Sequence, residues 1–208
     1  MGFTPTRYDN NVWIKPREDG CNFIATHVDD FIVVAKDSKK HSDQIKKALN
    51  LSSECSIDFF LGHDIRQKNN GSWATSAKTS VHKTIAKEEQ AMGEVSVASI
   101  SAIKNDHSEE YFSASLNALG LNHHQVMIGC LNWIFTLGRM HIGNATISLA
   151  RFSAGLREGH LARVLRIVGC LKKRPNLEIV HDPIEMYQTN NGRTTNRIEL
   201  IACHPDSA

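Results

Sequence analysis

The feature that most constrains this sequence is a pair of adjacent aspartates, Asp29 and Asp30, between two apolar, β-branched runs. These runs, Cys21–Val28 and Phe31–Ala35, have the composition and length of β-strands. Neighbouring side chains of a continuous strand point to opposite faces, so adjacent aspartates within one strand would not act together. At a tight turn both can project from the same end, and aspartate is a favoured turn residue. The sequence therefore predicts a β-hairpin with the acidic pair at its tip.

Two carboxylates crowded at one tip repel each other unless a cation lies between them. Oxygen-only ligands favour Mg²⁺ over zinc, and Mg²⁺ that is bound by carboxylates usually also binds substrate phosphates. A magnesium site is therefore one interpretation of Asp29 and Asp30. A solvated turn without a ligand is the other, and the pair alone does not separate the two.

Length and composition set broad limits on the chain. Its 208 residues suffice for one domain or two small ones, and a net charge of +2 neither requires nor excludes a polyanionic partner. We find no bilayer-spanning hydrophobic run and no signal-peptide pattern, so we expect neither a membrane nor a secreted protein. The five cysteines lack Cys-x-x-Cys spacing, which argues against a disulfide framework or a zinc site.

Further elements are expected around the hairpin. Residues 12–14 have the pattern of a strand, and residues 39–49 that of a helix with an inward stripe of Ile45, Ala48 and Leu49. Residues 57–67 are strand-like and are followed by an Asn-Gly turn and a returning strand from Trp73 to Thr75. Strands in the first part of the chain and helices in the second predict an α+β fold.

The second part of the chain shows helical periodicity. Residues 77–87 are weakly helical, and residues 90–118 have the composition of a loop or poorly ordered linker. Helices are expected over 124–135, 142–152 and 159–173. Basic residues of the third helix lie largely off its apolar stripe, and they could follow phosphates or form a solvated face. They are Arg163, Arg166, Lys172, Lys173 and Arg174.

Several short motifs resemble the reverse transcriptase region of copia-type LTR retrotransposons. The stretch His27-Val28-Asp29-Asp30 is similar to the Tyr-x-Asp-Asp hairpin of reverse transcriptases, and residues 60–65 resemble the Phe-Leu-Gly-x-x-Ile segment of the copia-type family. The other matches follow in the family's order over about residues 1–182. They include Gly2-Phe3-Thr4-Pro5, Ile128-Gly129, Gly138-Arg139-Met140 and Arg157-Glu158-Gly159-His160-Leu161.

This resemblance implies a domain organisation. Residues 1–75 would form the C-terminal half of a polymerase palm: an antiparallel sheet with a covering helix, the Asp-Asp hairpin and a primer-grip-like hairpin. The primer-grip-like residues are Phe60, Leu61, Gly62 and His63. Residues 76–118 would be a partly disordered linker and the start of the thumb, and residues 119–182 a helical thumb or connection region. The polar residues 183–208 are expected to form a flexible tail.

The resemblance also implies a reaction, its cofactor and its partners. Nucleotidyl transfer in this family uses two Mg²⁺ ions, with Asp29 as the principal ligand and catalytic residue of the hairpin and Asp30 as its neighbour. The partners of the intact polymerase would be an RNA/DNA template–primer duplex, deoxynucleoside triphosphates and the upstream half of the enzyme. It would work in the cytoplasm, within virus-like particles, or in the nucleus.

The chain departs from the family pattern at four positions. Histidine stands at 27 where tyrosine is usual, histidine at 141 for aspartate, leucine at 156 for proline and cysteine at 170 for tyrosine. The third metal-binding carboxylate and the fingers would lie upstream, and no RNase H domain follows. We therefore expect no polymerisation by the isolated chain. The alternatives are a non-catalytic nucleic-acid-binding remnant and an inert relic of a transposable element.

Overall fold

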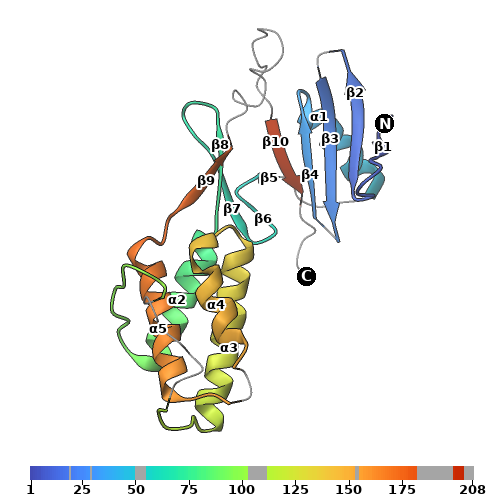
Figure 1. Cartoon of the computed structure of the whole chain (residues 1–208). Helices are drawn as coiled ribbons and strands as arrows, with labels where there is room; N and C mark the ends of the chain where they lie inside the picture. Colours follow the sequence, from blue (N-terminus) through green and yellow to red (C-terminus); the bar gives the residue numbers. More distant parts are fainter. Residues whose placement is uncertain are drawn as a thin grey trace. The chain divides into compact units, whose positions relative to one another are not determined.

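The structure, a computed structural model, describes residues 1–18, 20–28, 30–49, 55–102, 112–152, 155–181 and 199–203. The chain forms two compact units. The first comprises Met1–Leu61, Ile65–Ala74 and Val180–Ala208, and the second comprises Gly62–Asp64 and Thr75–Ile179. Strands and helices of both are shown in Figure 1, and the predicted α+β class is confirmed. The division into palm, linker, thumb and tail stays a prediction.

The first unit contains a six-stranded sheet with the order β1-β2-β3-β4-β10-β5. Its strand pairs are antiparallel. Strand β4 lies between β3 and β10, so the run after the acidic pair is a central strand of the sheet and not an edge. The bounds are β1 (Thr4–Pro5), β2 (Val12–Arg17), β3 (Gly20–His27), β4 (Asp30–Ala35), β5 (Cys55–Ser56) and β10 (Glu199–Cys203).

Helix α1 (Ser38–Leu49) packs on one face of this sheet (Figure 1). Its Ile45 joins a buried cluster with Ile24, Phe31, Val33 and Ala35. The predicted inward stripe is only partly right, because Ala48 is exposed and the Leu49 side chain lies outside the described residues. The other inward positions are polar: Ser38, His41 and Ser42 are buried.

A second sheet has the order β6-β7-β8-β9, and its strands contribute residues to both units. The strand expected over 57–67 is divided into two, because Leu61 and Gly62 adopt positive φ values of 49° and 83°. Positive φ at both central residues is the requirement of a type I′ hairpin turn. The bounds are β6 (Phe59–Phe60), β7 (His63–Gln67), β8 (Trp73–Ser76) and β9 (Glu178–His181).

The C-terminal region differs from the expected flexible tail. Residues 199–203 form strand β10, which pairs with β4 from Glu199↔Ala35 to Cys203↔Phe31 and with β5 on its other side. Periodicity did not reveal this strand, because a central strand is stabilised by two neighbours that lie far away in the sequence. The remainder of the predicted tail lies outside the described residues.

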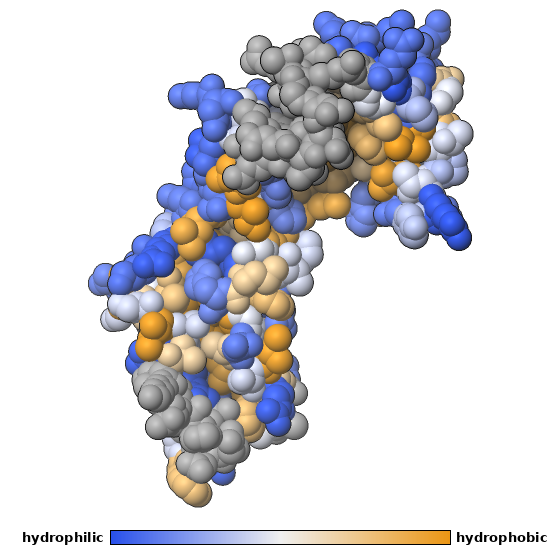
Figure 2. Space-filling model, turned by 45° about the horizontal axis from the view of Figure 1, so that its top comes forward, coloured by the Kyte–Doolittle hydropathy of each residue, from blue (hydrophilic) through white to orange (hydrophobic). Residues whose placement is uncertain are grey.

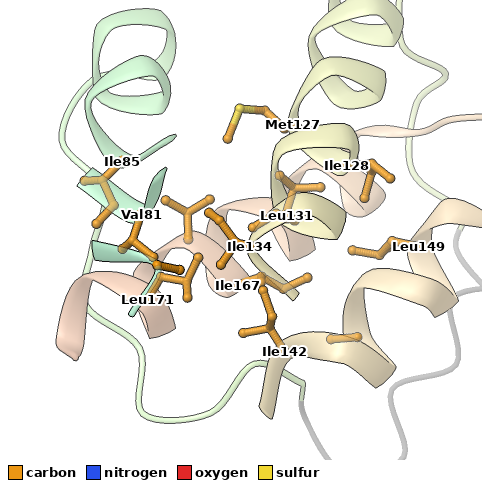
Figure 3. Packing of buried hydrophobic residues seen from close by; sticks show 14 of the residues in the cluster. Val81, Ile85, Met127, Ile128, Leu131, Ile134, Ile142, Leu149, Ile167 and Leu171 are labelled. Atoms are coloured by element: carbon orange, nitrogen blue, oxygen red, sulfur yellow. The ribbon is translucent and has the colours of Figure 1, made fainter. Parts of the chain in front are cut away.

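The second unit is mostly helical. Its core consists of aliphatic residues from all four α-helices, among them Val81, Leu131, Leu149 and Ile167 (Figure 3). The helices predicted over 124–135, 142–152 and 159–173 are confirmed as α3, α4 and α5. Helix α3 begins earlier than expected, at a cap where the Asn117 side chain accepts a hydrogen bond from the Gly120 amide. The bounds are α2 (Lys78–Met92), α3 (Ala118–Thr136), the 3₁₀ helix η2 (Met140–Ile142), α4 (Gly143–Ala150) and α5 (Glu158–Lys173).

Part of the expected linker is fixed against α5. The Ala98 amide donates to the Gly169 carbonyl at 3.1 Å, and Val95 is buried. A Cβ atom at Gly169 would lie 2.2 Å from the Ser96 carbonyl oxygen, so this helical glycine permits the close crossing of the two segments. Residues 103–111 lie outside the described residues.

The surface shown in Figure 2 intersperses hydrophobic residues with hydrophilic ones. Scattered exposed apolar residues are normal for a folded chain. Among the described helices, none combines the length and the apolar character that a bilayer crossing requires.

Candidate functional site

The acidic pair was predicted to lie at the tip of a β-hairpin, and the hairpin is confirmed. Strands β3 and β4 pair in a register that places His27 opposite Asp30, which leaves a two-residue turn between them. Val28, the first turn residue, has φ of 53° and is almost fully exposed. Asp30 is the first residue of β4, whereas Asp29 lies outside the described residues. The catalytic role of both stays a prediction.

The face of the sheet on which Asp30 lies follows from the register. Side chains alternate along a strand, and directly opposed residues of an antiparallel pair share a face. Phe31 and Val33 are buried in the cluster under α1. Asp30 and Ile32 therefore lie on the opposite face, together with His27. Asp30 is half-buried and His27 is exposed, so this face is open to solvent at the hairpin tip.

A second hydrophobic cluster connects this open face to the predicted primer-grip-like hairpin. Ile57 and Phe60 form its buried centre, and Ile32, Ile65 and Trp73 pack against it. Ile32 follows Asp30 by two residues on the same face of β4. Phe60 therefore lies over the sheet face that carries Asp30, and the primer-grip role of its hairpin stays a prediction.

Gly62, in the turn of the primer-grip-like hairpin, packs against α3. A Cβ atom at Gly62 would lie 2.5 Å from Cζ2 of Trp133 in that helix. The glycine serves the positive φ of the turn and its packing against an indole ring. Nothing in the spacing of Trp133 along the sequence indicated this contact.

Asp64 directly follows the primer-grip-like residues in the sequence, but its carboxylate makes a structural contact. Its carboxylate accepts hydrogen bonds from the Thr79 amide, at 2.8 Å, and from the Thr79 hydroxyl. Thr79 is in the first turn of α2, where a carboxylate compensates unpaired amides and the helix dipole. Asp64 is therefore not a replacement for the third metal-binding carboxylate that the resemblance requires.

The described residues do not complete a magnesium site. Asp30 supplies one carboxylate at the hairpin, and a described group of three or more histidine, cysteine, aspartate or glutamate side chains suited to a metal ion is absent. Mg²⁺ in proteins is usually bound by one or two carboxylates with water and substrate phosphate. The magnesium requirement stays a prediction.

The predicted basic face of α5 does not act as one surface. Lys172 Nζ donates to Glu89 Oε1 at 2.6 Å and to the Val95 carbonyl at 2.9 Å. This hydrogen bond lowers the pKa of the Glu89 carboxyl. At 100° per residue, Lys172 lies on the side of the helix opposite Arg163. Lys172 therefore fixes α5 to α2 and to the segment after it.

The other basic residues of α5 are arranged differently. Lys173 is exposed and donates to the Ser99 hydroxyl at 2.7 Å, and Arg174 is exposed at the C-terminal cap. Arg163 and Arg166 are half-buried on the helix itself. These four, without Lys172, remain the candidate phosphate-binding residues.

Comparison with known proteins adds one finding. No family model matches the chain, and no solved structure matches it. The chain is similar to a transposon protein. That protein, assigned to transposon Ty5-1 of Saccharomyces cerevisiae, is 26% identical over 192 residues, which cover 86% of this chain and 60% of the relative. The chain therefore spans about 60% of the length of this curated relative. The match agrees with the predicted relation to a transposable element.

Proposed function

We propose that this chain is the C-terminal palm half and adjoining helical region of a copia-type retrotransposon reverse transcriptase. The observation that carries the proposal is the hairpin, with Asp30 on the open face of an antiparallel sheet and Phe60 packed over the same face. The similarity to a Ty5-1 transposon protein supports a transposon-related origin. The chemistry would be RNA-directed DNA synthesis, in the cytoplasm or the nucleus.

The isolated chain does not polymerise, because its catalytic constellation is incomplete. Asp29 and Asp30 would bind magnesium only together with a carboxylate from an upstream segment. Positioning of the primer end and the incoming nucleotide needs the fingers as well, and positioning supplies much of the rate in such reactions. The partners are therefore the upstream half, a template–primer duplex and deoxynucleoside triphosphates.

A primer-extension assay tests this proposal. The isolated chain is expected to give no product with Mg²⁺ or Mn²⁺, whereas its fusion to the upstream half of a copia-type reverse transcriptase is expected to extend the primer. Asp30→Asn should abolish extension by the fusion. Asp58→Asn is the matched control, because Asp58 is an exposed aspartate of the same unit and should leave extension unchanged. Product from the isolated chain, or activity that survives Asp30→Asn, would contradict the proposal.

The alternative function is a non-catalytic nucleic-acid-binding remnant. The exposed basic end of α5, at Lys173 and Arg174, favours it. It predicts binding of an RNA–DNA duplex that survives Asp29→Asn, with a binding constant whose logarithm falls linearly with the logarithm of salt concentration. An inert relic would show neither duplex binding nor cooperative unfolding. Fluorescence anisotropy at several salt concentrations separates these outcomes.

A further inference from the structure

The tip of the β7–β8 hairpin (Figure 1) carries a polar groove that has no role in the proposed polymerase function. The groove lies within the first unit, has a volume of about 380 Å³ and is lined by Arg66, Lys68, Asn69 and Asn70. Arg66, Asn69 and Asn70 are exposed and Lys68 is half-buried, so a dissolved ligand can reach the groove. Among the described residues, this lining contains two cations and two amides but neither a carboxylate nor an aromatic ring. We call it the Arg66 groove.

The two cations lie on the same side of the hairpin. Strand β7 ends one residue before Lys68, but the Lys68 amide donates to the Ser72 carbonyl at 2.8 Å, so the backbone pairing extends through Lys68. Side chains two residues apart on a strand point the same way, with about 6.5 Å between their Cα atoms. Ile65, which alternates with Arg66, packs in the hydrophobic cluster of the primer-grip-like hairpin. Arg66 and Lys68 therefore face away from that cluster.

Local hydrogen bonds hold the tip of the hairpin in one shape. Gly71, with a φ of 87°, donates its amide to the Lys68 carbonyl at 2.9 Å. The Asn70 side-chain oxygen accepts hydrogen bonds from the Ser72 amide at 3.1 Å and from the Ser72 hydroxyl at 2.7 Å, and Ser72 is buried. Asparagine and glycine suit these positions, since one closes an Asx turn and the other tolerates positive φ. The groove is thus formed before a ligand arrives, which reduces the ordering cost of binding.

The surroundings of the groove leave its cations able to contact a ligand. Arg66 and Lys68 each take part in an interaction within the folded chain. A guanidinium has five N–H donors and an ammonium has three, so each can contact a ligand in addition. Asp64 precedes Arg66 by two residues on the same strand, but it lies outside the lining and its carboxylate accepts hydrogen bonds from Thr79. The lining itself is therefore suited to an anion.

We propose that the Arg66 groove binds the phosphate backbone of a nucleic-acid strand without reading its sequence. A planar guanidinium matches two oxygens of a phosphate, and charge-assisted hydrogen bonds of this kind are the strong ones. Arginine, lysine and asparagine side chains are among the usual donors to nucleic-acid phosphates. Bases need aromatic or arginine planes to stack on or base-edge contacts to be read, and this small polar tip offers a strand its charges instead.

Fluorescence anisotropy of the full chain with a labelled RNA–DNA duplex, at several salt concentrations, tests the proposal. The double substitution Arg66→Gln and Lys68→Gln should weaken binding about tenfold, equally for two duplexes of unrelated sequence. It should also reduce, by about 2, the slope of the logarithm of the binding constant against the logarithm of salt concentration. The control is the double substitution Lys40→Gln and Lys47→Gln, which removes the same charge from exposed positions of α1 in the same unit.

A single substitution tests the groove without removing either cation. Asn70→Asp retains the side-chain oxygen that binds Ser72 but places a negative charge in the lining. It should weaken duplex binding about threefold, as expected for one exposed like charge beside a phosphate. Asn11→Asp is the matched control, because Asn11 is an exposed asparagine of the same unit outside the lining.

A chain that binds no duplex would overturn the proposal, as would unchanged binding in the variant that lacks both groove cations. Poly-L-glutamate should compete much more weakly than unlabelled duplex, because the dense charge of a duplex releases condensed counterions on binding. Equal competition at equal charge concentration would assign the groove to acidic polymers in general and would also refute the nucleic-acid proposal. Neither Asp29 nor Asp30 lines the groove, so duplex binding and primer extension are separate measurements and the two proposals can fail separately.

Discussion

At the residue scale, backbone conformation imposes requirements that side-chain chemistry does not reveal. Val28 and Leu61 both have positive φ, at 53° and 49°, in the turns of the β3–β4 and β6–β7 hairpins. An L-residue in this region pays roughly 1–2 kcal/mol, and a β-branched residue is least suited to it. Strain of this kind is frequent at functional sites. Both turns therefore store strain close to residues that the resemblance assigns to primer and metal binding.

Val28→Asn should raise the free energy of unfolding by about 1 kcal/mol, because asparagine tolerates a left-handed conformation and is favoured in type I′ turns. Little packing is lost, since the Val28 side chain is 89% exposed. Urea denaturation measures the difference. Val28→Ala is the matched control, because it removes the branched side chain but keeps a Cβ atom at positive φ. An equal gain in both variants would refute the strain argument.

Gly138→Ala should lower the free energy of unfolding by about 2 kcal/mol. Its φ is 96°, and a Cβ atom would lie 2.5 Å from Cδ1 of Ile179. The control is Gly129→Ala in the interior of α3, where no heavy atom lies within 4 Å of the added Cβ. That substitution should stabilise the chain by up to about 1 kcal/mol, the difference in helix propensity. Thermal denaturation of both variants checks the opposite signs.

At the element scale, α2, α3 and α5 enclose a group of ionisable side chains that apolar periodicity did not predict. His124 is buried with no hydrogen-bond partner for either ring nitrogen among the described residues. His123 Nε2 lies 2.9 Å from Oε2 of the fully buried Glu88, and His160 Nδ1 accepts a hydrogen bond from the Arg157 amide. Burial lowers the pKa of His124 to about 4, assisted by His160 and His123.

Stability of the helical unit should consequently fall in mild acid. The folded pKa of His124 is lowered, so the unfolded chain binds more protons between about pH 6.5 and about pH 4. The contribution of neutral His124 is complete above that range and is lost as the pH falls through it, by about 3 kcal/mol at most. His124→Leu should flatten the dependence in denaturation series across pH. His82→Gln, on the exposed side of α2, should leave it unchanged.

The basic residues of α5 should separate into two classes. Lys172→Gln should raise the pKa of the Glu89 carboxyl back toward its usual range and lower stability, because it removes the link between α5 and α2. The double substitution Arg163→Gln and Arg166→Gln should instead weaken binding of an RNA–DNA duplex. It should also reduce, by about 2, the slope of the logarithm of the binding constant against the logarithm of salt concentration. Carboxyl NMR titration and anisotropy measure the two effects. Loss of duplex binding on Lys172→Gln in a folded chain would contradict this division.

At the scale of the whole molecule, each unit has a hydrophobic core of its own. The helical unit is built around residues such as Leu131, and the sheet unit around residues such as Val33, both with 0% exposure. Two separate cores predict that a cavity in one reduces the stability of that unit first. On the sheet face opposite α1, Phe23 is 37% exposed.

Leu131→Ala should cost the helical unit about 2–5 kcal/mol, because it opens a cavity among fully buried neighbours. Amide hydrogen exchange should then accelerate in α3 and α5 by a larger factor than in β3 and β4. Val33→Ala is the reciprocal variant and should show the opposite pattern. Equal acceleration in both units for both variants would mean that the chain unfolds as a single cooperative unit.

The sequence by itself determined the elements whose information is local. Apolar, β-branched composition located β3 and β4, and helical periodicity located the helices, because both patterns follow from local strand and helix preferences. The acidic pair with its β-branched flanks predicted the hairpin, since turn chemistry acts between neighbours. The ordered motifs also indicated the transposon relation with which the Ty5-1 protein agrees.

Only the tertiary structure decided the features that depend on distant residues. Strand β10 exists because β4 and β5 offer it hydrogen-bond partners, and Gly62 is constrained by Trp133. In the sequence, Lys172 and Arg166 were equally good candidates for phosphate binding. In the structure, Lys172 instead donates hydrogen bonds to Glu89 and to the Val95 carbonyl. Packing brings these groups together across long sequence separations. A local pattern therefore identifies a residue's chemistry, while the contacts that use it are set by the fold.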